Sequence, residues 1–95
     1  MVYFIATTYF EEGKEKGDYL KYIEAVKPIV SKYHGRYIVR SEKVTALSRD
    51  WRPNRVIIIE FDTREQLDMC FSSEEYRAIA SLRENSVDSK AVIIE

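Results

Sequence analysis

Residues 55–61 read RVIIIEF, and this run is the strongest strand signal in the chain. Its central residues, 56–59, are consecutive and apolar. Successive side chains of a strand point to opposite faces, so two of these residues must lie on each face of the sheet. An antiparallel sheet with helices on one face usually alternates apolar and polar residues. The run therefore predicts a sheet that is covered on both faces.

The flanking sequence predicts the other elements. Further strands are expected at residues 2–9, at residues 36–47 with an irregular part after residue 41, and at residues 90–95. Apolar residues at helical spacing predict helices at residues 19–33, 63–71 and 74–87. The order is β-α-β-β-α-β, the α+β ferredoxin-like arrangement, with the second helical region in two parts. Right-handed crossovers place the first and third strands in the centre of an antiparallel four-stranded sheet with the helices on one face.

Short polar residues and glycines mark the helix ends. Asp18 is expected to cap the first helix, Thr63 with Gln66 forms a capping box for the second, and Ser73 caps the third. Gly35 is expected to end the first helix in the left-handed conformation. A polar loop at residues 10–17 precedes the first helix, and a turn at residues 48–54 joins the two middle strands.

The second apolar face of the sheet needs a cover that the helices cannot supply. Leaving about six large side chains in water would forgo roughly 10 kcal/mol, at about 1.5–3 kcal/mol each. A second copy of the sheet, packed face to face with two-fold symmetry, is the simplest cover. We therefore expect a homodimer. Ile58→Asp and Ile59→Asp should both disrupt folding, one through the core and the other through the interface, since the two residues point to opposite faces.

Several runs resemble one known family. They are residues 32–40 (KYHGRYIVR), 50–61 (DWRPNRVIIIEF), 73–76 (SEEY), 82–83 (LR) and 88–89 (DS). In this order and spacing they are similar to the domain-of-unknown-function family thirteen-thirty, of the dimeric α/β-barrel superfamily. The resemblance implies a homodimer whose two sheets form a barrel, and it implies no particular reaction. The chain departs from the pattern at His34, at residues 41–42, at Glu74 and in the longer loop at residues 10–17, which could reshape the mouth of a cleft.

Length and composition narrow the class of protein. With 95 residues we expect one domain, residues 1–95. The formal net charge of −1 argues against nucleic-acid binding, and a strand lacking the Gly-aromatic pattern argues against an RNA-recognition module. The single cysteine suits a reducing compartment, and no apolar run is long enough for a membrane helix. With no signal peptide at the start, we expect a cytoplasmic protein.

The chemistry-bearing residues are few. His34 is the only histidine, which excludes sites built on a histidine pair, and no metal or cofactor is expected. Cys70 is expected to be a small buried hydrophobe. The candidate ligand-pocket residues are Arg40, Glu60, Tyr76, Arg83 and Trp51. Trp51 is expected mainly to anchor its loop against the body or the partner subunit, with ligand stacking as the second interpretation.

Glu60 is the most unusual of these residues, because it ends an isoleucine run in a central strand. If Leu47 lies opposite Arg55, then Arg40 is a diagonal neighbour of Glu60 on the same face. The expected pair would form the charged floor of a cleft, with Arg83 as an anion clamp. Structural and ligand-binding roles for this pair are both left open.

Two functions fit these observations. The first is a cytosolic dimeric barrel that binds a small molecule in a cleft between sheet and helices, with a cofactor-free enzyme as its catalytic form. The alternative is a dimerisation or regulatory module without catalytic activity, in which the outer sheet face serves only assembly.

Overall fold

The structure, a computed structural model, describes residues 1–11 and 16–95. Its elements are β1 (Val2–Tyr9), α1 (Gly17–Lys32), β2 (Arg36–Ser41), β3 (Arg55–Phe61), α2 (Arg64–Ser72), α3 (Glu74–Glu84) and β4 (Asp88–Ile94). Residues 12–15, half of the loop expected at residues 10–17, lie outside the described residues. The strand β2 ends at Ser41, so the part expected to be irregular is not strand, and β4 begins two residues earlier than expected.

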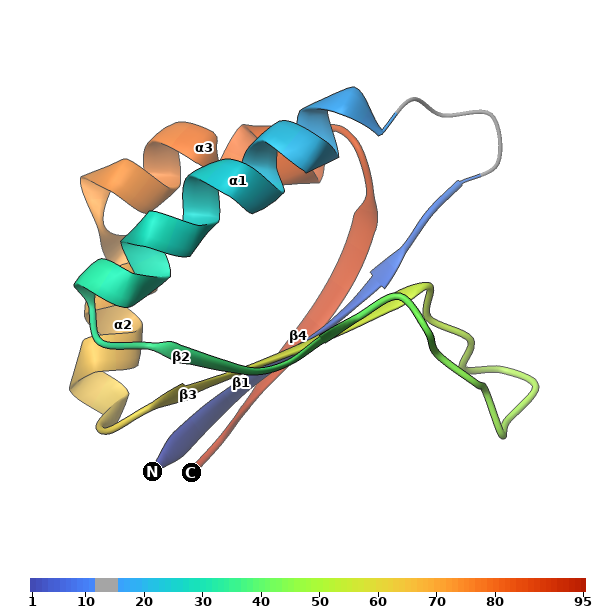
Figure 1. Ribbon diagram of the computed structural model, residues 1–95, viewed down its shortest axis with the longest axis horizontal. Coiled ribbons are helices and arrows are strands. Elements are labelled where there is room, and N and C mark those ends of the chain that lie inside the picture. Colours follow the sequence, from blue (N-terminus) through green and yellow to red (C-terminus); the bar gives the residue numbers. More distant parts are fainter. Residues whose placement is uncertain (12–15) are drawn as a thin grey trace.

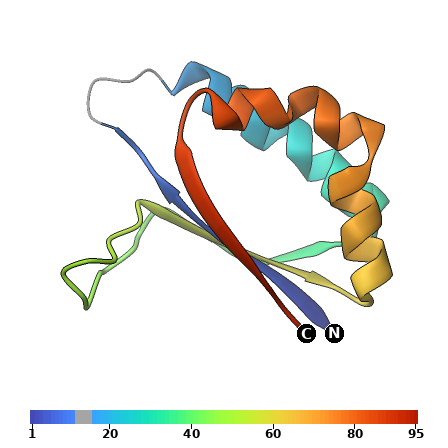
Figure 2. The same ribbon diagram turned by 180° about the vertical axis from the view of Figure 1, so that it is seen from behind.

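The four strands form one antiparallel sheet in the order β2-β3-β1-β4. The helices α1, α2 and α3 lie on one face of it, and the other face is bare of any element in residues 1–11 and 16–95 (Figures 1 and 2). This confirms the ferredoxin-like fold and the central position of the first and third strands. Residues 42–54, which join β2 to β3, extend away from the sheet as a long loop (Figure 1).

Strand register assigns each residue of β3 to a face. Ile59 and Phe61 are buried under the helices, at 3% and 0% exposure, so alternate residues of β3 face the helices. We call this side the inner face, and the bare side the outer face. Ile58 lies on the outer face and is the centre of an apolar row, because cross-strand neighbours share a face. The row runs across all four strands as Val92, Ile5, Ile58 and Val39.

Helices α2 and α3 begin at the expected caps. The Gln66 N–H donates to Thr63 Oγ1 at 3.2 Å, and the Tyr76 N–H donates to Ser73 Oγ at 3.1 Å. The expected cap at Asp18 is wrong: α1 starts at Gly17, and Lys16 occupies the cap position without a side-chain hydrogen bond. Asp18 lies instead in the first turn, where a carboxylate interacts favourably with the helix dipole.

The C-terminal end of α1 also differs from expectation. The residue with positive φ is His34, at 65°, and not Gly35. The His34 N–H donates to the Ser31 carbonyl at 3.0 Å and the Gly35 N–H donates to the Val30 carbonyl at 2.9 Å, which is the Schellman pattern with His34 as the left-handed residue.

Gly35 is required for a different reason, which is close packing. A Cβ at Gly35 would lie 2.7 Å from Val30 Cγ1 and 2.8 Å from Phe61 Cε1. Both neighbours are fully buried, so neither has room to move. The missing side chain therefore lets the end of α1 rest directly on β3.

We expect Gly35→Ala to lower the free energy of unfolding by about 1–3 kcal/mol, because the added methyl overpacks this contact. His34→Gly should leave stability unchanged or raise it by less than about 1 kcal/mol, because glycine adopts positive φ without strain but is freer when unfolded. Urea denaturation of both variants measures the difference. A neutral Gly35→Ala together with a destabilising His34→Gly would contradict this assignment.

Candidate functional site

A cavity of about 280 Å³ lies between the inner face of the sheet and the three helices. Its wall on the sheet side comes from all four strands, and its cover comes from α1, α2 and α3. This volume is near the lower end of the range for ligand pockets.

The cavity exists because the inner face is made of small side chains at one end. Ala6 and Ala91 are direct neighbours on β1 and β4, and Thr8 and Ser89 are the next inner-facing neighbours on the same strands. All four line the cavity. We call them the small-residue floor. Larger residues at the same positions would extend toward the helices and fill the space. The short side chains of the floor therefore leave room for the cavity.

The rest of the wall is largely aromatic. Tyr19 and Tyr22 are three residues apart on α1 and so project from the same face of the helix. Tyr22 meets Tyr76 of α3 edge-to-face at 6.2 Å between ring centroids, and Phe71 of α2 meets Tyr76 in the same way at 5.0 Å. Phe4 of β1 stacks on Phe71 at 4.4 Å. These contacts give the cavity a rigid apolar wall.

Polar groups enter the cavity from α1 and α3. The hydroxyls of Tyr22 and Tyr76 share a hydrogen bond of 3.0 Å. The guanidinium carbon of Arg83 lies 5.8 Å from the centre of the Tyr22 ring. Burial, with Tyr76 as neighbour, raises the pKa of Tyr22 well above its ordinary value, so the phenol stays protonated at neutral pH.

A second set of polar side chains lies on the sheet. It is a cross-strand row formed by Ser89 of β4, Thr8 of β1 and Arg55 of β3. Tyr19 donates its hydroxyl proton to Thr8 Oγ1 at 3.4 Å. The Ser89 Oγ and the Arg55 Nε are buried and have no hydrogen-bond partner among the described residues. Buried polar atoms are usually paired, so each of these two atoms can form a further hydrogen bond.

Of the predicted site residues, the structure brings Tyr76 and Arg83 together at the cavity. Trp51 lies in the loop of residues 42–54 with 58% of its surface exposed. Arg40 lies on the inner face of the edge strand β2, where its guanidinium carbon is 5.3 Å from the centre of the Tyr37 ring. Tyr37 lines the cavity and Arg40 does not.

The expected pair of Arg40 and Glu60 is wrong. Arg40 lies opposite Ile57 on the inner face, whereas Glu60 lies opposite Arg36 on the outer face. The assumed register failed because the loop between β2 and β3 is longer than the expected turn, which places Arg40 opposite Ile57. The bulge between Tyr37 and Val39 then brings Arg36 opposite Glu60.

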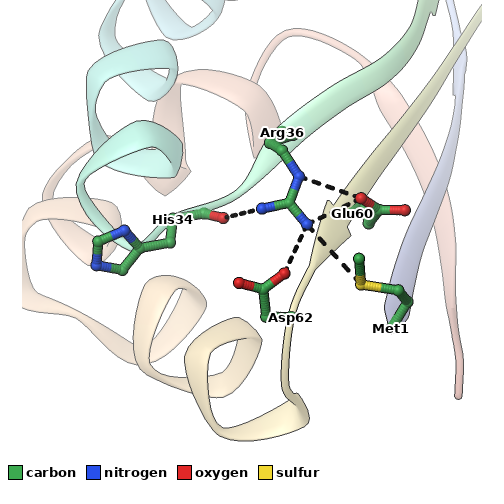
Figure 3. A network of polar contacts seen from close by, with 5 residues as sticks. All are labelled: Met1, His34, Arg36, Glu60 and Asp62. Carbon is green, nitrogen blue, oxygen red and sulfur yellow. Dashed lines mark hydrogen bonds and ion pairs between the residues drawn. The ribbon is translucent and has the colours of Figure 1, made fainter.

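Glu60 instead belongs to a network centred on Arg36 (Figure 3). Arg36 donates to Glu60 Oε1 from Nε at 3.1 Å and from Nη2 at 2.8 Å, and to Asp62 Oδ1 from Nη2 at 2.8 Å. A further hydrogen bond at 3.3 Å reaches the His34 carbonyl. The Arg36 hydrogen bonds hold the pKa of Glu60 below its ordinary value, against a smaller opposing effect of desolvation. This network faces away from the cavity.

The remaining candidates are structural. Cys70 is fully buried, and desolvation raises its pKa to about 11, so it is the inert core residue that we expected.

Among residues 1–11 and 16–95, no three His, Cys, Asp or Glu side chains gather in a way that could hold a metal ion. No helix in the same residues is long and apolar enough to cross a membrane.

Sequence reasoning missed Tyr22, Arg55 and the small-residue floor. The sequence signal for the floor is that Ala6 ends one apolar run and Ala91 begins another, each as the small residue of its run. Their meaning depends on cross-strand register, which pairs two positions 85 residues apart in the sequence.

The family model for a domain of unknown function, DUF1330, matches residues 1–95. The chain belongs to this family. This match agrees with the resemblance seen in residues 32–40 and 50–61. The family has no assigned activity. Among the curated proteins, none matches the chain.

Solved structures share the fold at low sequence identity. A protein of unknown function from Rhodopseudomonas palustris is 14% identical, with a TM-score of 0.83 over 98% of this chain and 79% of that chain. SnoaB, a cofactor-independent oxygenase from Streptomyces nogalater, is 10% identical, with a TM-score of 0.67 over 99% and 90%. A dimeric protein of unknown function with a ferredoxin-like fold, from Bacteroides fragilis, is 13% identical, with a TM-score of 0.60 over 99% and 94%.

Glu60→Gln should reveal the Arg36 network through the pH dependence of stability. The pKa of Glu60 is lowered in the folded state from 4.5, so its ion pair stabilises the fold above pH 4.5, and this stabilisation is lost as the pH falls through the folded-state pKa. The stability difference between wild type and Glu60→Gln should therefore be largest at neutral pH and shrink in acid. Urea unfolding between pH 3 and pH 7, values chosen to bracket this transition, measures it. In an Arg36→Met background the same substitution should show little pH dependence, and an equal dependence there would reject the pairing.

Proposed function

We propose that the protein is a homodimer that binds a small, mostly apolar molecule in the cavity between sheet and helices. The observation that carries this proposal is the small-residue floor beneath a wall of aromatic side chains. Burying a large apolar side chain stabilises a protein by about 1.5–3 kcal/mol. Ala6 and Ala91 forgo that stabilisation at adjacent positions, which is understandable if the space is used for a ligand.

The polar groups around the cavity support binding by hydrogen bonds. Among the described residues that line it, they are hydroxyls and one guanidinium. The unpartnered Ser89 Oγ offers a hydrogen bond that a ligand or a bound water would complete. A few placed polar groups in an otherwise apolar wall are the usual composition of a ligand site.

If the protein also acts on the molecule that it binds, we propose an enzyme that works without a cofactor. The oxygenase from Streptomyces nogalater, described as cofactor-independent, has the same fold. At 10% identity this likeness concerns the fold and brings no activity or residue role to the present chain.

The outer face of the sheet supports the homodimer. The row Val92, Ile5, Ile58 and Val39 is apolar across all four strands, and Ile94 and Tyr3 border it. Val92 is 57% exposed in the single subunit and Ile94 is 49% exposed. The fold relative from Bacteroides fragilis is dimeric. A second copy of the same face is complementary in apolar character and would bury about 800 Å² or more per subunit.

Two expectations from composition accompany the proposal. The near-neutral charge favours a protein without a nucleic-acid partner. The lone cysteine, Cys70, is buried, which suits the cytoplasm as the proposed location.

Ala6→Leu should abolish binding while preserving the fold, because leucine fills the cavity floor. The probe is 2-naphthalenemethanol, a neutral bicyclic molecule, and saturation-transfer NMR with a titration measures its affinity. We expect saturable binding to wild type and at least about tenfold weaker binding to Ala6→Leu, because the probe and the leucine compete for the same volume.

Ala78→Leu adds the same atoms at an exposed position of α3 and is the matched control, which should bind as wild type does. If Ala6→Leu unfolds, Ala91→Leu at the neighbouring floor position replaces it. Equal binding by wild type and a folded floor variant would reject the cavity as the site. Absence of binding to a dimeric wild type would favour the dimerisation module.

Ile58→Asp and Ile59→Asp separate the two faces of β3. Ile58→Asp should give a folded monomer, because it places a charge in the proposed interface. Ile59→Asp should prevent folding, because the side chain is 3% exposed and lies in the core. Light scattering and circular dichroism measure mass and folding. A wild-type mass of 11.2 kDa, or an Ile58→Asp variant that is still dimeric, would contradict the proposed interface.

A further inference from the structure

The cavity has a polar end and an apolar end. Arg83 lies in the last turn of α3, and a short link joins this turn to Asp88 at the start of β4. Ser89 therefore lies near the same end, together with its cross-strand neighbour Thr8, which Tyr19 reaches from the first turns of α1. The opposite end is lined by Phe4, Ile59 and Phe71.

The electrostatic environment of the cavity is positive. Arg83 is the one charged side chain among the described residues that line it. Its ion-pair partner is Glu84 at 3.9 Å, whose side chain is 61% exposed, while that of Arg83 is only 28% exposed. An exposed carboxylate at this distance neutralises a partly buried guanidinium weakly. Arg83 also interacts with the side chains of Tyr76 and Tyr22, but its charged partner is this exposed carboxylate, so an anion in the cavity would meet a weakly neutralised cation.

Arg55 adds a second positive charge next to the cavity. It lies on the inner face beside Thr8, and only 7% of its surface is exposed. Its Nε is buried without a hydrogen-bond partner among the described residues. Burial raises the pKa of the lining residue Tyr37 to about 12, and the charges of Arg40 and, more weakly, Arg55 oppose this rise. A buried guanidinium with an open donor favours an acceptor that carries negative charge.

The hydroxyl pair contributes a further donor. Tyr22 and Tyr76 carry two phenolic protons, and their mutual hydrogen bond uses one of them. The second proton can be donated to a ligand. A guanidinium and a phenolic O–H at one end of a cavity are complementary to an acceptor-only group, such as a carboxylate or an enolate.

The volume limits the size of the apolar part. A cavity of about 150 Å³ holds a single benzene ring. The 280 Å³ present here suits one substituted ring or two fused rings. The aromatic side chains that line it, among them Phe4, Phe71 and Tyr37, favour a flat aromatic ligand over a branched aliphatic one.

We propose that the ligand is a small planar aromatic acid, held with its anionic group at the polar end beside Arg83 and its ring system over Ala6 and Ala91, toward the apolar end. This inference rests on the proposed function, because it names the ligand class of the same cavity. Arg83 is the residue that selects for negative charge, and the Tyr22–Tyr76 pair orients the anionic oxygen.

Three probes of nearly equal shape test the charge preference. They are 2-naphthoate, neutral 2-naphthalenemethanol and cationic 2-naphthylmethylammonium, each titrated into the full chain at pH 7 with binding followed by NMR and calorimetry. We expect the wild type to bind 2-naphthoate about tenfold to a hundredfold more tightly than the alcohol, as one or two charge-assisted hydrogen bonds would give. The ammonium should bind most weakly.

Arg83→Met should remove the preference for 2-naphthoate over the alcohol, because methionine keeps much of the apolar stem but carries no charge. Arg77→Met, at an exposed position of the same helix, should retain the full preference and is the matched control. If Arg83→Met does not fold, Arg83→Lys serves in its place: it keeps the charge but loses the forked geometry, so it should lower the preference only in part.

The outcomes separate this inference from the proposed function. Equal affinity for 2-naphthoate and the alcohol, with both lost in Ala6→Leu, overturns the anionic ligand class and leaves the cavity as a binding site. Tightest binding of the ammonium, or a preference for 2-naphthoate that Arg83→Met retains, also overturns it. Failure of all three probes to bind the folded wild type overturns both the inference and the proposed function.

Discussion

The two central strands are apolar on both faces, and this constraint determines much of the rest of the structure. Because side chains alternate along a strand, the run of residues 56–59 must divide between two environments. Ile57 and Ile59 face the helices, and Val56 and Ile58 face outward. The inner face binds α1, α2 and α3 and forms the core. The outer face has no covering element within the described chain (Figure 2), and the hydrophobic effect favours its burial against a second surface.

The inner face is itself divided between a packed end and an open end. At the packed end, Gly35 lets the last turn of α1 contact Phe61 directly, with no room for an additional methyl group. At the open end, the short side chains of Ala6 and Ala91 leave space between the sheet and Tyr19 and Tyr22 near the start of the same helix. The fold is thus anchored where packing is tightest, and the space for a ligand lies where side chains are smallest. The tightly packed end of the inner face fixes the helix relative to the sheet, and so fixes the walls of the cavity at the open end. Such rigid support suits a binding site.

Charge follows the same division of the sheet. Arg36, Glu60 and Asp62 form their network on and beside the outer face, with donors and acceptors matched (Figure 3). On the inner side the Nε of Arg55 is buried without a partner among the described residues, and Arg83 has only an exposed carboxylate as its charged partner. A satisfied network stabilises a fold, whereas unmatched buried donors create affinity for an external acceptor. This difference is why the proposed site is assigned to the inner face although Glu60 was the more conspicuous residue in the sequence.

The sequence by itself determined the order of elements, the central position of the strands at residues 2–9 and 55–61, the caps at Thr63 and Ser73 and the two-sided character of the sheet. These features depend on local propensity and on periodicity, which short segments contain. Tertiary structure alone decided that Glu60 pairs with Arg36 and not Arg40, that His34 and not Gly35 is left-handed, and that Ala6 and Ala91 form one floor. Each of these depends on register or packing between distant segments. A one-residue shift, such as the bulge after Tyr37, moves a side chain to the opposite face, and nothing in the local sequence marks it.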